Sequence, residues 1–179
     1  MHEAHDFVRP ATPLDAASLG AIHAASMRWG LTHALGGELP SDAVSQILPE
    51  EFARAWKHAI MSPPDPRAAV LVAVTDGAVA GFTAVYPLET TDVPPTAEIT
   101  AFEVEPGHTR AGHGSRLLAA ASDTAAELGA AGLTVWILAG DDARTQFFAS
   151  AGFAPAGIRR ILNVAGHNVV EHGWHAVLH

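Results

Sequence analysis

The chain has 179 residues, a length that suits one domain with a substantial hydrophobic core, and we expect a single domain over residues 1–179. Hydrophobic residues make up 49% of it and charged residues 16%, which excludes a disordered chain, while the apolar runs are too short to cross a membrane. The net charge of −9 disfavours a nucleic-acid partner, because an acidic surface repels phosphates, and it favours cationic ligands.

The sequence contains no cysteine, which excludes disulfides, thiolate catalysis and cysteine-ligated zinc. The polar, acidic stretch from Met1 to Asp6 carries no signal-peptide pattern, so we expect a cytoplasmic protein without a membrane partner. The eleven histidines are scattered. His172 and His175 stand three apart in a predicted strand, where that spacing directs them to opposite faces. We therefore expect no metal site.

The first third of the chain predicts a short strand and two helices. Phe7–Pro10 is predicted to be a strand, and Thr12 is placed to cap a helix that has proline at its first position and Asp15 closing the cap. A second helix is predicted over Pro49–Met61, and the proline-rich segment Ser62–Pro66 ends it.

Three strands are predicted to follow. Ala69–Thr75 and Ala78–Tyr86 are apolar and are joined by Asp76-Gly77, a strong hairpin signal. Pro87–Pro95 is polar and contains prolines, which indicates a loop. The next segment, Ala97–Val104, alternates and is rich in β-branched and aromatic residues, so it is predicted to be a strand.

The last third predicts helices alternating with strands. Apolar residues recur at helical spacing from Leu117 to Leu128, and Gly129 ends the pattern. Leu133–Leu138 is a predicted buried strand, parallel to the one ending at Val104 because a helix connects them. Asp141 or Asp142 is predicted to cap a helix that ends at Gly152. Extended segments complete the chain: Phe153–Ala156, Ile161–Val164 and Asn168–Leu178.

The stretch Val104–Leu118 carries the strongest functional signal. It contains three glycines and two arginines, Arg110 and Arg116, between a predicted strand and a predicted helix. Glycine allows close approach of the backbone to a ligand, and a helix start offers unpaired N–H groups and a positive dipole end. The arrangement predicts a phosphate-binding site. A Rossmann fingerprint would need glycine at Leu117, and a Walker loop would need a lysine that this stretch lacks.

The same stretch resembles the acyl-CoA-binding motif of the GCN5-related N-acetyltransferases. Val104, Pro106, Gly112 and Gly114 match a Val-x-Pro and a Gly-x-Gly at the family's spacing. Thr109 departs from the pattern, because the family has glutamine or arginine there. A second family motif is matched further on by Asp141, by Phe147-Phe148 and by Gly152-Phe153.

The resemblance implies an α/β (mixed α+β) fold, with a central mixed, mostly antiparallel sheet of about seven strands flanked by about four helices. It also implies transfer of an acetyl group from acetyl-CoA to a primary amine, by direct attack in a ternary complex without a metal. The amine would be a small molecule or a peptide N-terminus, and a homodimer is compatible with the family. The residues expected to bind the cofactor are Phe102, Glu103, Val104, Thr109, Arg110, Ala111, Gly112, His113, Gly114, Ser115 and Phe148.

The resemblance makes Glu98 the candidate catalytic base, because family members with a strand-borne glutamate carry it at this offset from the loop. Glu103 is the second candidate, although an odd step of five residues directs it to the opposite face of the strand. Phe148 stands where many relatives have a tyrosine that protonates the leaving thiolate. Because Thr109 and Phe148 depart from the family pattern, the sequence leaves an alternative function open, namely a CoA-binding sensor or interaction module with little or no turnover.

Acceptor specificity would come from two segments, Trp29–Pro40 and Leu88–Thr96. Within and near the first of them, Trp29, His33, Glu38 and Trp56 are candidates for an acceptor pocket, and both tryptophans are equally candidates for the core. The sequence leaves the acceptor and the oligomeric state open.

Overall fold

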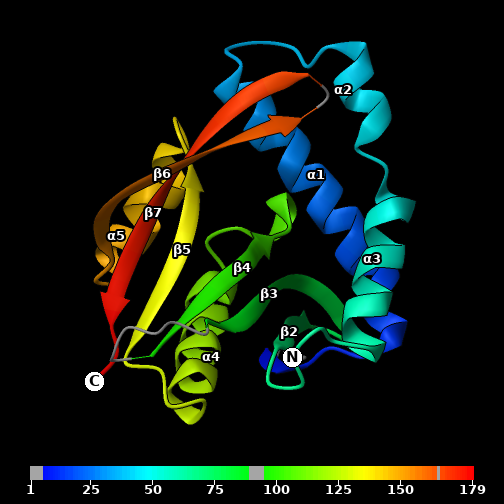
Figure 1. The fold of residues 1–179 in the computed structure, drawn as a ribbon. Helices are drawn as coiled ribbons and strands as arrows, with labels where there is room; N and C mark the ends of the chain where they lie inside the picture. Colours follow the sequence, from blue (N-terminus) through cyan, green and yellow to red (C-terminus); the bar gives the residue numbers. More distant parts are fainter. Residues whose placement is uncertain (1–5, 89–94, 165) are drawn as a thin grey trace.

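A seven-stranded mixed sheet separates two layers of helices in the computed structural model, which describes residues 6–88, 95–164 and 166–179 (Figure 1). The strands are β1 (Phe7–Pro10), β2 (Ala69–Thr75), β3 (Ala78–Leu88), β4 (Thr96–Val104), β5 (Gly132–Leu138), β6 (Ala154–Val164) and β7 (His167–Val177). The helices are α1 (Ala16–Ala34), α2 (Ser41–Gln46), α3 (Pro49–Met61), α4 (His113–Glu127) and α5 (Asp142–Ser150), with 3₁₀ turns at Pro13–Asp15 and Pro106–His108. The spatial order of the strands is β1-β2-β3-β4-β5-β7-β6, and only β4 and β5 are parallel.

The predicted fold class is confirmed, and so are most of the predicted elements. The predicted helix Pro49–Met61 matches α3 at both ends, and Asp76-Gly77 joins β2 to β3. Three details differ. The short helix α2 was not predicted, α4 begins at His113 rather than beyond the glycine loop, and β6 is one strand rather than two short ones. Within the described residues, none of the helices is long and apolar enough to span a membrane.

Each face of the sheet has its own apolar core. On one face, here called the α4 face, α4 and α5 pack through residues such as Leu117 and Phe148. On the other, the α1 face, Leu19 and Ile22 of α1 pack against β2, β3 and β4. The β6–β7 hairpin extends beyond the sheet and lies against α1 and α2, where Val169 packs beside Ala24 and Ile47 (Figure 1).

Strand β4 contains an irregularity that decides where its side chains point. Opposite β3, Ala101 pairs with Ala84 but Ile99 pairs with Val85, so Thr100 is an extra residue and forms a bulge. One extra residue reverses the alternation of faces beyond it. Ile99 and Phe102 therefore both contribute to the core on the α4 face, although they are three residues apart.

Strands β4 and β5 separate after a short parallel ladder. Their pairing runs from Thr96 with Gly132 to Ile99 with Val135 and goes no further. The edge of β4 from Thr100 to Val104 therefore has no hydrogen-bonded neighbour strand on the β5 side. This opening points toward the glycine loop that precedes α4.

The predicted cap at the start of the first helix is built around Asp15. Its carboxylate forms a bidentate ion pair with Arg9, with N–O distances of 2.7 and 2.9 Å, and accepts the backbone N–H of Thr12 at 2.7 Å. The hydrogen bonds from Arg9, more than those from Thr12, lower the pKa of Asp15 from 3.8 to about 2. A carboxyl group with a lowered pKa stabilises the fold above its unfolded pKa, and that stabilisation is lost as the pH falls through the folded value.

We therefore expect Asp15→Asn to lower the free energy of unfolding at pH 7 by about 1.5–3 kcal/mol, the range for hydrogen bonds to a charged group. The difference from the parent protein should shrink at pH 3, because the parent begins to lose the same ion pair within the window between pH 4 and pH 2. Urea unfolding at both pH values measures the two differences. An equal deficit at pH 7 and pH 3 would contradict the lowered pKa of Asp15.

Candidate functional site

The loop between β4 and α4 has the backbone that its glycines suggested. Gly112 is the N-cap of α4 and has φ of +81°, in the left-handed region that favours glycine. Arg110 also has a positive φ, +64°, so two turns in close succession bring the chain into the helix. The first N–H groups of α4 have no intrahelical acceptor and face the end of the loop. Thr109 is exposed, and its hydroxyl donates to the carbonyl oxygen of Pro106 at 3.2 Å.

The two arginines of this loop have different environments. Arg116 is paired with Asp6 at 2.7 Å, donates to the carbonyl oxygen of Ala111 at 3.1 Å, and contacts Nδ1 of His113 at 3.1 Å. Arg110 is exposed, and among the described residues its side chain has no hydrogen-bond or ion-pair partner. Arg110 is therefore the cation that is available to a ligand at this loop.

His113 is buried at the start of α4, and its predicted contact with the cofactor stays a prediction. Its side chain is 2% exposed, and burial lowers its pKa, with the positive charge of Arg116 acting in the same direction. A neutral imidazole at this position accepts the hydrogen bond from Arg116. Gly114, one residue later, faces the ring of Phe147, and a Cβ at Gly114 would lie only 3.3 Å from that ring. Ser115 and Ala111 are exposed on the loop side of the helix start.

Glu98 and Glu103 lie on the same face of β4, the α1 face. The prediction that Glu103 points away from Glu98 is wrong, because the bulge at Thr100 reverses the alternation between them. Glu98 is next to Ala97, which lies in the core of the α4 face, so Glu98 points to the opposite face. Its carboxylate accepts a hydrogen bond from the indole N–H of Trp136 on β5, at 3.2 Å. Glu103 accepts a hydrogen bond from the hydroxyl of Ser26 on α1.

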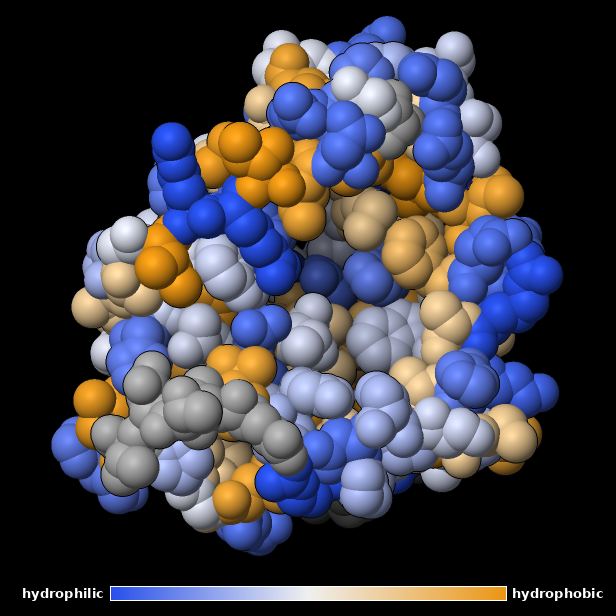
Figure 2. All heavy atoms as spheres, viewed as in Figure 1, coloured by the Kyte–Doolittle hydropathy of each residue, from blue (hydrophilic) through white to orange (hydrophobic). Residues whose placement is uncertain are grey.

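A charged side chain of β6 extends the environment of Glu98. The guanidinium of Arg160 lies over the ring of Trp136, 4.4 Å from its centroid, and its Nε donates to Glu171 on β7 at 2.6 Å. Glu98, Trp136 and Arg160 thus form a continuous surface on the α1 face. Figure 2 shows a hollow in the middle of this side of the molecule, between the β6–β7 hairpin and the helices of the α1 face, with hydrophilic side chains at its floor.

Arg144 crosses the opening between β4 and β5, although it was not among the predicted site residues. It belongs to the first turn of α5, where its N–H is capped by Asp141 at 2.9 Å. Its Nη2 donates both to the carbonyl oxygen of Phe102 and to Glu103 Oε2, each at 2.7 Å. Although burial opposes the charged form, the ion pair with Glu103 raises the pKa of Arg144 above its ordinary value.

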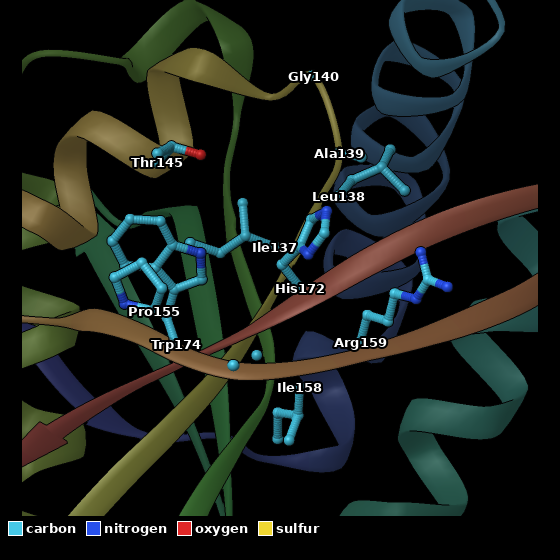
Figure 3. A pocket seen from close by; sticks show the side chains of 12 residues that line it. Ile137, Leu138, Ala139, Gly140, Thr145, Pro155, Ile158, Arg159, His172 and Trp174 are labelled. Carbon is cyan, nitrogen blue, oxygen red and sulfur yellow. The ribbon is translucent and has the colours of Figure 1, made fainter.

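Two cavities lie beside the site without including the glycine loop. One of about 560 Å³ lies near the end of β5, where Thr145 of α5, Ile137 and Trp174 line it together with His172 and Arg159 (Figure 3). It adjoins the irregular part of β6, where the residues between Pro155 and Arg159 face Gly173 alone. The other, about 350 Å³, lies under α3 and borders Tyr86 and Thr100.

A comparison with protein families gives one match: the model of the Acetyltransferase (GNAT) family matches residues 37–153. The chain belongs to this GNAT acetyltransferase family. The suspected resemblance is thereby confirmed. A search of curated proteins found no match.

Solved structures of GNAT proteins share the fold across nearly the whole chain. The PaiA N-acetyltransferase of Thermoplasma acidophilum, in complex with coenzyme A, is 16% identical with a TM-score of 0.71, covering 96% of this chain and 98% of that one. A Salmonella typhimurium protein with its cofactor acetyl-CoA is 20% identical, with a TM-score of 0.67 and coverage of 97% and 94%. The ribosomal-protein-alanine N-acetyltransferase of Brucella melitensis is 21% identical, with a TM-score of 0.68 and coverage of 96% and 99%.

The position of the GNAT tyrosine is occupied by a core residue in this chain. Phe148 is completely buried and packs with its ring centroid 5.2 Å from that of Phe102 and 5.1 Å from that of Phe153. It therefore supports Phe102 from behind, and its predicted contact with the cofactor stays a prediction. The chain's one tyrosine, Tyr86, pairs with Glu98 across β3 and β4 instead.

The residues expected to form an acceptor pocket divide into two groups. Trp29 is about half exposed and stacks on His33, with ring centroids 4.0 Å apart. Trp56 packs against Phe82 in the core of the α1 face and donates to Nδ1 of His23 at 3.0 Å. Of the second expected segment, Leu88–Thr96, residues 89–94 lie outside the described part of the chain.

Proposed function

We propose that this protein transfers the acetyl group of acetyl-CoA to a primary amine, by direct attack of the amine on the thioester. The observation that carries the proposal is the opening between β4 and β5, which connects the loop before α4 with a carboxylate-bearing surface on the α1 face. A donor bound along the opening and an acceptor bound on the α1 face would meet at β4.

The donor side is supported by the backbone of the loop and of β4. The diphosphate binds at the start of α4, where unpaired N–H groups and the helix dipole favour an anion, and Arg110 adds a full charge. Phe102 and Val104 direct their N–H and C=O groups into the opening, because Ala101 and Glu105, which flank this stretch on either side, bond toward β3. The pantetheine arm pairs with these groups, and the N–H of Phe102 donates to the thioester oxygen as negative charge develops there.

The acceptor side is supported by Glu98. Its carboxylate lies on the α1 face and takes a proton from the acceptor ammonium, directly or through a water. The neutral amine then attacks the thioester carbonyl, the C–N bond forms, the C–S bond breaks, and CoA leaves as a thiolate. The second proton of the attacking nitrogen passes to that thiolate or to solvent, which leaves the neutral amide. A thiol with a pKa of about 8.5 leaves without an acid catalyst, so the absence of a tyrosine at Phe148 does not prevent turnover.

The availability of Arg110 leads to a prediction about CoA affinity. Arg110→Ala should weaken CoA binding by about 1.5–3 kcal/mol, the range for a hydrogen bond to a charged group. Arg159→Ala, which removes the same charge from the exposed strand β6, should leave the affinity unchanged. Calorimetric titration with CoA and with 3′-dephospho-CoA measures the effect and tells whether Arg110 contacts the ribose phosphate or the diphosphate. Equal affinities for CoA in Arg110→Ala and the parent would remove Arg110 from the site.

Release of free CoA, measured against a panel of amines, tests the proposed activity. The panel contains an amino acid, a polyamine, an aminoglycoside and a peptide with a free N-terminus, and mass spectrometry identifies the acetylated product. Amine-dependent release of CoA supports the enzyme. Saturable binding of acetyl-CoA without release for any amine supports the alternative of a CoA-binding module.

A further inference from the structure

Arg144 joins three elements that surround the opening between β4 and β5. Its backbone is fixed at the start of α5, and its Nη2 reaches Phe102 and Glu103 on β4. Glu103 is held in turn by Ser26 of α1. Helices from both faces of the sheet are thus connected through one carboxylate and one guanidinium at the point where the strands separate.

The ion pair lies largely out of water, with the side chain of Glu103 11% exposed and that of Arg144 25% exposed. Taking two charges out of water is costly, and such pairs often contribute little net stability compared with apolar side chains of similar size. A stabilising role alone is therefore a weak explanation for the pair. Its position suggests a different role, because it controls a peptide group at the edge of the opening.

The peptide groups of Phe102 face the opening with no strand opposite them. The residue directs both its N–H and its C=O toward the β5 side, and beyond Ile99 no β5 backbone pairs with either. Arg144 satisfies the carbonyl group. This bond fixes the orientation of the β4 backbone at Phe102. It leaves the backbone N–H as the group of Phe102 that can donate to a ligand in the opening. It also places a positive charge beside the position where an oxyanion would form.

We propose that Arg144, held by Glu103, is a positioning residue for acyl transfer, which holds the β4 backbone at Phe102 through its carbonyl group so that the N–H on the other side of the same residue polarises the thioester carbonyl. The inference rests on the proposed function, because it assumes that the thioester lies in the opening. It assigns Glu103 to the support of Arg144 rather than to proton transfer. Glu98 alone then acts as the base.

Kinetics of matched variants test this role. Arg144→Gln should lower kcat by up to about 10²-fold, the cost of misplacing a reacting group, with KM for acetyl-CoA near the parental value because the phosphates bind elsewhere. Arg144→Lys should recover most of kcat, because both bonds to β4 come from one nitrogen. Glu103→Gln should cause a smaller loss than Arg144→Gln, since the bond to Phe102 remains. Arg54→Gln, on the exposed face of α3, serves as the control for charge.

The infrared carbonyl band of bound acetyl-CoA, labelled with ¹³C at the acetyl carbonyl, gives a second readout that needs no acceptor. In the parent the band should lie at lower frequency than in free acetyl-CoA, and in Arg144→Gln it should return toward the free value. A purely structural role would lower the melting temperature of Arg144→Gln while leaving the band and the kcat of the folded protein unchanged, and that result would overturn the inference. An unshifted band in the parent would also overturn it.

The same measurements separate this inference from the proposed function. A shifted band in the parent that depends on Arg144, without CoA release for any amine, supports the role of Arg144 and contradicts turnover. CoA release that is equal in the parent and in Arg144→Gln supports the enzyme and overturns the role of Arg144. Failure of the parent to bind acetyl-CoA overturns both.

Discussion

Replacing Glu98 with glutamine should lower the rate of acetyl transfer by roughly 10²–10⁴-fold, the contribution expected of a general base. Glutamine keeps an oxygen that can accept the hydrogen bond from Trp136, so the geometry of the α1 face should persist. Affinity for acetyl-CoA should barely change, because the side chain lies on the α1 face and the phosphates bind at the loop before α4. Steady-state rates and CoA titrations across a pH range, with an acceptor identified in the panel, measure both quantities.

The pH profile distinguishes a base from a residue that only binds the acceptor. In the parent, the rate should rise toward alkaline pH without the falling limb that a tyrosine acid would add, because Phe148 cannot donate a proton. Glu105→Gln, which changes a half-exposed carboxylate bound to His108, serves as the matched control. Near-parental turnover of Glu98→Gln at every pH would dismiss Glu98 as the base and leave deprotonation of the amine to solvent.

Gly112→Val should abolish measurable binding of acetyl-CoA while leaving the fold intact. The φ of +81° at this residue is unfavourable for a β-branched side chain by about 1–2 kcal/mol, and its Cβ would lie 3.1 Å from the guanidinium of Arg116. The valine side chain must therefore either displace the start of α4 or cover the N–H groups there that would bind the phosphates. Calorimetric titration with acetyl-CoA measures binding, and circular dichroism establishes that the variant is folded.

Gly129→Val provides the matched control for Gly112→Val. Gly129 lies just past the other end of α4 with φ of +77°, and a Cβ there would meet nothing within 4 Å. The two substitutions thus impose a similar backbone strain on the same helix, at opposite ends. If Gly112→Val and Gly129→Val bound acetyl-CoA equally well, the phosphate site would lie elsewhere.

Most of the secondary structure could be predicted because long amphipathic elements and special turns leave local signals. The apolar period of α4, the proline at the start of α3 and the Asp-Gly turn between β2 and β3 depend only on neighbours in sequence. Helix α2 has six residues, too few for a period to emerge, and its Ala43 is buried only through tertiary packing. The continuous strand β6 is exposed along its length, so it has no alternation to detect.

The candidate site was partly predictable for the same reason. The glycines and arginines of the loop, the cap at Asp141 and the candidate base Glu98 could all be found from local patterns and from the family resemblance. Ser26, Glu103 and Arg144 could not be grouped in this way, because they come from three elements that are distant in sequence. The one local hint was an arginine in the first turn of α5, where an acidic cap already balances its charge.

The sequence by itself determined the family, the order of the elements and the loop before α4, since each of these depends on residue types at short, fixed spacings. The tertiary structure alone decided which face of β4 carries Glu103. A bulge arises from the pairing of two strands, so the extra residue at Thr100 cannot be recognised in β4 alone. Likewise, the separation of β4 from β5 exists only between two strands, and the contact of Arg144 with Phe102 exists only across that opening. Such features depend on the register between segments that are distant in sequence. A local sequence pattern holds no information about that register.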